Sequence, residues 1–334
     1  MPEDKIVMAH GSGGSATGEL IAELFAKQFD NETLNQMEDS AVVFGTKKIA
    51  MTTDSFVVTP LEFPGGDIGR LAVCGTVNDL LMRGAKPTYL TCGFILQEGA
   101  SITQLKRIVA SMAQTAKEAG VQIVAGDTKV VEGNGGLFIN TAGVGLFPED
   151  REQTEICAAG AKTGDSILVS GNLGDHHAAI LSQRMGIKNG IQSDCAPLGE
   201  IVEVLLQKNL PVHTLRDVTR GGLASVLKEL AEASQKAFVL KQDDLPVTKE
   251  VQDFCGLLGL DPLYMGNEGK LVAFVPKEYE AEALEAMRSA KYGQDATVIG
   301  YVEEAPKGEV LLHTSIGGVR SLDVLMGEGL PRIC

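Results

Sequence analysis

Four aspartates follow or flank apolar segments, and their carboxylates are suited to bind a magnesium ion. They are Asp54, Asp79, Asp127 and Asp217. Each one alone is equally acceptable as a cap of a helix or turn, but four in similar settings favour a shared role. Mg²⁺ prefers hard oxygen ligands and commonly binds together with substrate phosphates. The pattern therefore predicts a site for Mg²⁺ and a polyphosphate, to which Asn78 would add a neutral oxygen.

Two glycine-rich turns lead directly into predicted helices and offer backbone N–H groups to an anion. They are His10-Gly11-Ser12-Gly13-Gly14 and Arg220-Gly221-Gly222. Helix N-termini that follow such turns bind phosphate groups. Lys129 and Lys270, together with Arg220, would supply local positive charge on an acidic chain. For the first turn, a flexible N-terminal arm is an equally acceptable interpretation.

Cys334 is the last residue of the sequence and follows a stretch that contains Gly327 and Gly329. A thiol placed there can move into and out of an active site, because the residues before it have little to hold them. An ordinary frayed terminus explains the same position equally well. Three other cysteines stand in hydrophobic contexts and are expected to be buried packing residues: Cys74, Cys92 and Cys255.

Several common catalytic motifs are absent. Residues 266–270 resemble the end of a Walker A loop, but Leu271 stands where Ser or Thr is required. No GxGxxG turn follows a strand, and no GxSxG segment is present. The adjacent His176 and His177 are interpreted as the start of a helix, since neighbouring side chains diverge. His213 and His313 stand in apolar, strand-like runs and are expected to be structural residues.

The composition indicates a two-domain globular protein that binds neither nucleic acid nor an anionic membrane. A length of 334 residues fits two domains. The formal net charge is −15, whereas both of those partners require clustered Lys and Arg. No apolar run approaches the ~18 residues of a membrane-spanning helix, and no leader segment is recognised. The 6 cysteines form no CxxC pair, so we expect a soluble, cytoplasmic protein without a disulfide framework.

Helical and extended segments alternate along the chain and would position these residues. Hydrophobic spacing and capping residues predict helices over 15–29, 67–82, 101–119, 175–185, 197–209, 221–235, 247–258 and 277–290. Expected strands cover 48–53, 89–96, 121–125, 137–147, 167–170, 238–240, 271–275, 297–302 and 310–313. Ser15 is the predicted cap of the first helix, and Ser101 or Thr103 that of the third, which Gly120 closes. The fold class is therefore α+β, with two α/β domains over 1–150 and 151–320 and a flexible tail over 321–334.

Nine ordered sequence blocks resemble the HypE family of hydrogenase maturation factors. They are HGSGG at 10–14, TTDSFVVTP at 52–60, FPGGDIG at 63–69, LAVCGTVNDL at 71–80, GAKP at 84–87, AGDTKVV at 125–131, DVTRGGLA at 217–224, NEGK at 267–270 and PRIC at 331–334. They follow the family's order over essentially the whole chain. This family belongs to the superfamily of aminoimidazole ribonucleotide synthetase and selenophosphate synthetase. Glu62 and His177 depart from its pattern, where an aromatic and a small residue are usual.

The resemblance implies an ATP-dependent carbamoyl dehydratase built from two domains of the aminoimidazole ribonucleotide synthetase type. A partner carbamoyltransferase would deliver a carbamoyl group to the thiol of Cys334. ATP would activate the carbamoyl oxygen, and its loss would leave a thiocyanate. The cyano group would then pass to the iron of a [NiFe]-hydrogenase on a scaffold of two further maturation proteins. A homodimer through the N-terminal domains is expected as well.

The resemblance also implies roles for individual residues. The four aspartates named above would bind Mg²⁺ and ATP. Further nucleotide contacts would come from His10, Gly11, Asn78, Thr128, Arg220, Gly221 and Gly222. Glu268 is the predicted base that removes protons from the carbamoyl nitrogen, and Lys129 would orient the thiocarboxamide. Arg332 would favour the thiolate of Cys334, which the neighbouring C-terminal carboxylate disfavours.

Two other functions remain open at this point. Another ATP-using member of the superfamily, such as a phosphotransferase that makes an acyl or seleno phosphate, would share the aspartates without needing Cys334. A non-catalytic metal chaperone would use Cys334 with His10 or His313, although the chain lacks any two-residue ligand spacing. Retained activity of Cys334→Ala would favour the first. Bound Ni or Fe without ATP turnover would favour the second.

Overall fold

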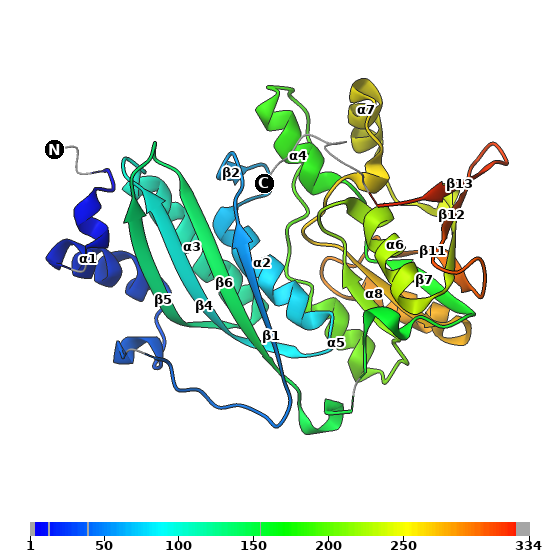
Figure 1. The fold of residues 1–334 in the computed structure, drawn as a ribbon, viewed down its shortest axis with the longest axis horizontal. Coiled ribbons are helices and arrows are strands. Elements are labelled where there is room, and N and C mark those ends of the chain that lie inside the picture. Colours follow the sequence, from blue (N-terminus) through cyan, green and yellow to red (C-terminus); the bar gives the residue numbers. More distant parts are fainter. Residues whose placement is uncertain (1–3, 13, 39, 154, 325–334) are drawn as a thin grey trace.

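Two α/β domains lie side by side in the computed structural model, which describes residues 4–12, 14–38, 40–153 and 155–324 (Figure 1). The first domain is built on a four-stranded sheet and the second on a seven-stranded sheet. Both sheets contain parallel and antiparallel pairs, so the predicted α+β class with mixed sheets is confirmed. Cys334 and the rest of 325–334 lie outside the described residues, as does Gly13.

The sheet of the first domain has the strand order β1-β6-β4-β5. Its strands are β1 (Ile49–Phe56), β4 (Lys86–Gln97), β5 (Gln122–Val131) and β6 (Leu137–Leu146). Two helices, α2 (Ile68–Leu81) and α3 (Ile102–Ala119), cover one face, and α2 also contacts the second domain (Figure 1). A short hairpin, β2 (Glu62–Phe63) and β3 (Gly66–Asp67), leads into α2. This arrangement places α2 between the first sheet and the second domain.

The ends of these helices follow from their capping residues. The side chain of Asp67 accepts hydrogen bonds from the first-turn backbone of α2, and Ser101 does the same for α3. Gly120 ends α3 in the left-handed conformation, as predicted. The prediction for Ser15 is wrong, because Gly14 is the N-cap and Ser15 is the first residue of α1 (Ser15–Leu20). The helix then continues as a π-helical segment, Ile21–Ala26.

The sheet of the second domain has the order β13-β12-β9-β11-β7-β10-β8. Its strands are β7 (Asp165–Val169), β8 (Thr214–Asp217), β9 (Ala237–Lys241), β10 (Leu271–Pro276), β11 (Thr297–Glu303), β12 (Val310–His313) and β13 (Val319–Leu322). The helices are α4 (Asp175–Arg184), α5 (Gly199–Gln207), α6 (Gly222–Ser234), α7 (Lys249–Leu258) and α8 (Glu280–Ser289). Side chains of α5 and α8 pack on one face of the sheet, and those of α6 pack on the other. The first face shares one hydrophobic core with the first domain, which joins the two domains.

Several strands differ from the sequence prediction. β5 runs to Val131, past the predicted end at residue 125, so Asp127 lies inside the strand. β8 and β13 were not expected, because each has only four residues and includes polar side chains. β13 also extends across residue 321, where the tail was expected to begin. No helix of the described part of the chain is long and apolar enough to cross a membrane.

Candidate active site

Five of the predicted residues meet in one cavity of about 220 Å³ between the two domains. They are Asp54, Asp79, Asp217, Arg220 and Glu268. The first domain contributes β1 and α2, and the second contributes the end of β8, the turn before α6 and the loop before β10. Residues that are distant in the sequence therefore form one polar site.

Close packing of β1 against α2 brings the first two carboxylates together. A side chain at Gly75 would place its Cβ 2.8 Å from the ring of Phe56 and 3.9 Å from Oδ2 of Asp54. Glycine at this position of α2 therefore lets the strand approach the helix. One turn further along α2, Asp79 accepts a hydrogen bond of 2.8 Å from the hydroxyl of Thr52. The helix face that carries Asp79 is thus fixed against β1.

Burial and mutual repulsion disfavour simultaneous ionisation of the carboxyl groups in this cavity. Burial raises the pKa of Asp79, and Asp54 raises it further. Burial raises the pKa of Asp217 to about 7, with Asp79 as the next cause. The pKa of Glu268 is also raised well above its usual value, first by burial and then by Asp217, while Arg220 opposes the shift. A cation among these groups would offset the repulsion.

These residues fit a magnesium ion that shares its coordination with a nucleotide. Within the described ranges, no three His, Cys, Asp or Glu side chains are placed to hold a metal ion by themselves. Mg²⁺ usually keeps several waters and binds through one or two carboxylates together with substrate phosphates. A separated set of carboxylates suits that mode of binding better than an all-protein metal cage does.

The loop that carries Glu268 is fixed by contacts with the segment around Asp194. The backbone N–H of Glu268 donates to Oδ1 of Asp194 at 3.0 Å, and Nζ of Lys270 lies 3.3 Å from Oδ2 of Asp194. A Cβ on Gly269 would lie 1.8 Å from the carbonyl oxygen of Asp194, so no side chain fits there. The motif at 267–270 therefore holds Glu268 in one position at the cavity wall.

Asn78 requires a correction, because its carboxamide connects the two domains. Its Oδ1 accepts a hydrogen bond of 2.9 Å from the backbone of Leu198, and its Nδ2 donates to the carbonyl of Ala196 at 3.1 Å. The side chain is buried, and it is not among the residues that line the carboxylate cavity. Its predicted role as a neutral ligand of the metal or nucleotide is therefore replaced by a role in the domain contact.

Asp127, Thr128 and Lys129 lie apart from the carboxylate cavity, on the opposite edge strand of the first sheet. The register aligns one residue from each strand across this sheet: Asp54, Thr141, Cys92 and Gly126. Aligned residues share a face and successive residues alternate, so Asp127 faces away from the side on which Asp54 lies. Three strand spacings add a separation of about 14 Å. Within one chain, the structure therefore does not bring Asp127 to the other three aspartates.

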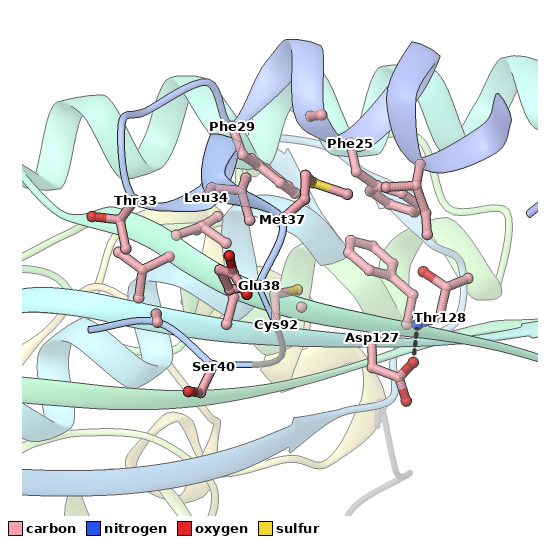
Figure 2. A pocket seen from close by; sticks show the side chains of 18 of the residues that line it. Phe25, Phe29, Thr33, Leu34, Met37, Glu38, Ser40, Cys92, Asp127 and Thr128 are labelled. Atoms are coloured by element: carbon pink, nitrogen blue, oxygen red, sulfur yellow. Dashed lines mark hydrogen bonds between the residues drawn. The ribbon is translucent and has the colours of Figure 1, made fainter. Parts of the chain in front are cut away.

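A second cavity, of about 310 Å³, lies beneath the N-terminal helices (Figure 2). Its wall includes the rings of Phe25 and Phe29, and Figure 2 shows the carboxylate of Asp127 directed away from these rings. Oδ1 of Asp127 accepts hydrogen bonds from the backbone of Thr128 at 2.8 Å and from Nζ of Lys129 at 2.9 Å. The contact with Lys129 lowers the pKa of Asp127. This pair is exposed and separate from Glu268.

The glycine turn near the N-terminus lies over β5 rather than at the carboxylate cavity. Nδ1 of His10 accepts a hydrogen bond of 3.1 Å from the backbone of Val7. A Cβ on Gly11 would lie 2.5 Å from the backbone nitrogen of Val130, so the turn packs tightly against the strand. His10 and Gly11 therefore lie beside the Asp127–Lys129 segment, and the structure does not bring them to Asp54.

The second glycine turn opens α6 at the cavity, as predicted. Gly221 and Gly222 have φ values of +80° and +66°, which side chains rarely adopt. A Cβ on Gly222 would also lie 2.4 Å from the carbonyl oxygen of Leu263. These two glycines allow the tight turn that directs Arg220 to the cavity.

Two residues near the site were not predicted from the sequence. His176 lines the cavity although it was interpreted only as part of a helix start, and Asp194 fixes the Glu268 loop. The position of His176 directly after a Gly-Asp turn was the signal available in the sequence. The expectation that Cys74, Cys92 and Cys255 are buried is confirmed.

Comparison with known proteins shows similarity along the whole chain. Residues 37–147 match the N-terminal domain, and residues 162–313 the C-terminal domain, of AIR synthase related proteins. The carbamoyl dehydratase HypE of Rhodobacter capsulatus is 46% identical over 340 residues, which cover 99% of each chain. A crystal structure of the hydrogenase maturation protein HypE in complex with ATP is 46% identical, covers 98% of this chain and 99% of that chain, and has a TM-score of 0.93.

A further solved structure shows a HypE–HypF complex. Its matching chain is 47% identical, covers 92% of this chain and 99% of that chain, and has a TM-score of 0.79. Both the sequence identity and the shared two-domain architecture extend over nearly the full length of these relatives. The chain therefore belongs to the HypE family of carbamoyl dehydratases in hydrogenase maturation, within the AIR synthase related proteins.

Proposed function

We propose that this chain uses ATP to remove the oxygen of a carbamoyl group carried on the sulfur of Cys334. The product is an S-cyanate, which supplies the cyanide ligands of the [NiFe]-hydrogenase iron. Family membership and the ATP complex of a relative support the proposal. Within this structure, the main support is that several carboxylates, Arg220 and Glu268 line one cavity between the domains.

The proposed reaction converts a poor leaving group into a good one. The carbamoyl oxygen attacks the γ-phosphorus of ATP, and ADP departs. This step is needed because an amide oxygen is a poor leaving group, whereas the phosphorylated oxygen can leave as phosphate. The nitrogen then loses its two protons, the C–O bond breaks, and phosphate leaves a C≡N group on sulfur. Arg220 stabilises charge on the transferred phosphoryl group. Mg²⁺, held through Asp54, Asp79 and Asp217, would supply further charge neutralisation when bound.

Glu268 is the proposed base for the carbamoyl nitrogen. Its raised pKa indicates a carboxyl group with a high affinity for protons, which suits a proton acceptor once it is ionised. The loop contacts with Asp194 hold it at the cavity wall. Lys129 lies too far across the sheet to act with Glu268 inside one chain, so any contribution from it requires a second copy.

We infer that two copies associate through the open face of the first sheet. This face, opposite α2 and α3, carries exposed apolar side chains: Ile49, Met51, Ile95 and Val131. Such a patch is typical of an interaction surface. Asp127 and Lys129 lie on this same face according to the register, so the interface is where we place their contribution. Light scattering that gives the mass of a single chain would contradict the dimer.

Two kinds of partner follow from this reaction. A carbamoyltransferase must load Cys334, and the complex of a HypE relative with HypF supports such a partner. A scaffold of two further maturation proteins would accept the cyano group for iron. We place the reaction in the cytoplasm, because five unpaired cysteines in the described part of the chain suit a reducing compartment.

Intact-mass measurement tests the proposed function most directly. The full-length protein is first incubated with the carbamoyltransferase and its substrates. The ATP that serves the dehydration step is added afterwards. We expect the mass of a carbamoyl adduct first, and the mass of a cyano adduct after ATP is added. A carbamoyl adduct that persists unchanged while ATP is hydrolysed would overturn the proposal.

Asp79→Asn is expected to raise the Mg²⁺ concentration needed for ATP hydrolysis by at least about tenfold, since each lost unit of charge weakens a cation site. Folding should change little, because the amide oxygen of asparagine still accepts the hydrogen bond from Thr52. Titration of ATPase activity with Mg²⁺ and thermal unfolding of the same protein measure the two effects. Normal Mg²⁺ dependence would show that Asp79 has only a structural role.

A further inference from the structure

We propose that Arg70 is a positioning residue for the dehydration, because its guanidinium fixes the segment that holds the loop of Glu268. This role rests on the proposed function. Arg70 lies in the first turn of α2, the helix that also carries Asp79. It is not among the residues that line the carboxylate cavity, so it acts on the reaction only through other residues.

The guanidinium of Arg70 donates hydrogen bonds to three different segments of the chain. Its Nε donates to the backbone carbonyl of Cys195 at 2.7 Å. Its Nη1 donates to Oε2 of Glu118 at 2.9 Å, and its Nη2 donates to the hydroxyl oxygen of Tyr292 at 3.3 Å. Glu118 belongs to α3 in the first domain, whereas Cys195 and Tyr292 belong to the second. The rigid fork of an arginine can hold several acceptors at once, and here it joins the two domains.

Glu118 is shared between Arg70 and the second domain, and we call Arg70, Glu118, Lys291 and Tyr292 the Arg70 cluster. Oε1 of Glu118 accepts hydrogen bonds from Nζ of Lys291 and from the hydroxyl of Tyr292. Burial alone would raise the pKa of Glu118, but hydrogen bonds from Lys291, Tyr292 and Arg70 lower it to about 2. The side chains of Arg70 and Glu118 are 18% and 19% exposed, so water competes little with this charged pair.

The backbone of Tyr292 adopts a conformation that large side chains rarely take. Its φ is +69°, in the left-handed region. The turn is held on both sides: a Cβ on Gly293 would lie 2.0 Å from the carbonyl oxygen of Met287, and the backbone N–H of Lys291 donates to Oε1 of Glu200 at 2.9 Å. Such a conformation persists only where the surroundings fix it, and it is typical of functional segments. Here it directs the phenol hydroxyl to the first domain.

The bond from Arg70 to Cys195 reaches the carboxylate cavity through one further residue. Asp194 directly precedes Cys195, and its Oδ1 accepts the hydrogen bond of 3.0 Å from the backbone N–H of Glu268. Its carbonyl oxygen lies so close to Gly269 that no side chain fits between them. The loop of Glu268 therefore has no room to stay in place if the segment at 194–195 moves.

α2 holds this segment at two points. Arg70 binds the carbonyl of Cys195, and Asn78 binds the carbonyl of Ala196 and the backbone N–H of Leu198. Eight residues, about two helical turns, separate Arg70 from Asn78, so both lie on the same face of the helix. Loss of Arg70 alone leaves the domains attached through Asn78 but allows the segment to tilt. We therefore expect a folded protein in which Glu268 is less well placed.

Arg70→Met in the full-length protein tests this role. After carbamoylation of Cys334 by the partner enzyme, we expect the single-turnover rate of cyanation at saturating ATP to fall by about tenfold or more. A distant substitution that misplaces a catalytic group by about 1 Å can cost up to about 100-fold. The affinity for ATP, measured by calorimetry, should change by less than about threefold, since no cavity residue is replaced. A wild-type rate of cyanation in the folded variant would overturn the proposal.

A second arginine pair of the first domain provides a matched control. Nε and Nη2 of Arg107 donate to the carboxylate of Glu62 at 2.8 and 2.9 Å. Both residues belong to the first domain, and neither lines the carboxylate cavity. Arg107→Met should therefore retain the wild-type rate of cyanation. Equal loss of cyanation in Arg107→Met and Arg70→Met would assign the effect to a general loss of ion pairs and overturn the proposal.

Tyr292→Phe supplies a second measurement, which also decides the matter if Arg70→Met does not fold. It keeps the ring and removes only the hydroxyl that binds Arg70 and Glu118, and it should slow cyanation about threefold without a change in ATP affinity. A wild-type rate in Tyr292→Phe would overturn the role of the Arg70 cluster.

The double variant of Arg70→Met and Tyr292→Phe tests whether the two residues act together. If they do, the double variant is no slower than Arg70→Met alone, because the hydroxyl of Tyr292 acts through the side chain that is already lost. Losses that multiply would show separate effects and overturn the proposal. If the wild-type protein never forms the cyano adduct, the proposed function itself fails, whereas equal rates in wild type and variants reject only the positioning role.

Discussion

Replacement of Cys334 by alanine is expected to abolish formation of the cyano adduct and to leave ATP binding intact. The thiol is the proposed site of attachment, whereas the cavity residues lie between positions 53 and 268. Intact-mass analysis after incubation with the carbamoyltransferase and ATP should show neither adduct. Calorimetric titration with ATP should give the wild-type affinity within about threefold, because no cavity residue has changed.

Cys157→Ala is the matched control for this experiment. Cys157 is the one cysteine in the described part of the chain that is not fully buried, and its hydrogen bonds with Thr214, Gly160 and His213 all involve its backbone. The control variant should form both adducts normally. A cyano adduct on Cys334→Ala would show that another atom carries the carbamoyl group, and the proposed attachment to Cys334 would then be wrong.

Local signals in the sequence were enough to predict most of the fold. α3 was predicted nearly to the residue, since Ser101, its apolar spacing and Gly120 all act within a few residues of the helix. β13 and β8 were missed because short strands with polar side chains are stabilised by their neighbours in the sheet rather than by their own pattern. The predictions therefore failed where long-range pairing determines the structure.

The same distinction explains the outcome for the site. Asp54, Asp79 and Asp217 could be grouped from their settings, and they do line one cavity. Asp127 has an equally suggestive setting, but strand order and residue parity place it on the far edge and the opposite face. Asn78 also has a sequence setting that suits a ligand, but its side chain is hydrogen-bonded to the other domain instead. No spacing within the sequence contains this information.

Glu268→Gln is expected to stop the reaction after carbamoylation, so that carbamoylated protein accumulates in the presence of ATP. Glutamine has nearly the same shape, and the backbone contact of residue 268 with Asp194 does not involve the side chain. The variant therefore removes the proton acceptor while it keeps the loop in place. We expect the rate of cyanation to fall by about 10²-fold to 10⁴-fold, the range found for general bases. Glu278→Gln, an exposed residue outside the cavity, is the control and should react normally.

The same variant separates two possible roles of this carboxylate. Burial and then Asp217 raise the pKa of Glu268 and disfavour its charged form, so a neutral amide at this position should change ATP binding little. A base acts after ATP has bound, so a variant that binds ATP at least as well as the wild type, yet does not form the cyano adduct, supports proton removal. A variant that loses ATP affinity and cyanation together would instead place Glu268 in nucleotide binding. Normal progress to the cyano adduct would exclude it from both roles.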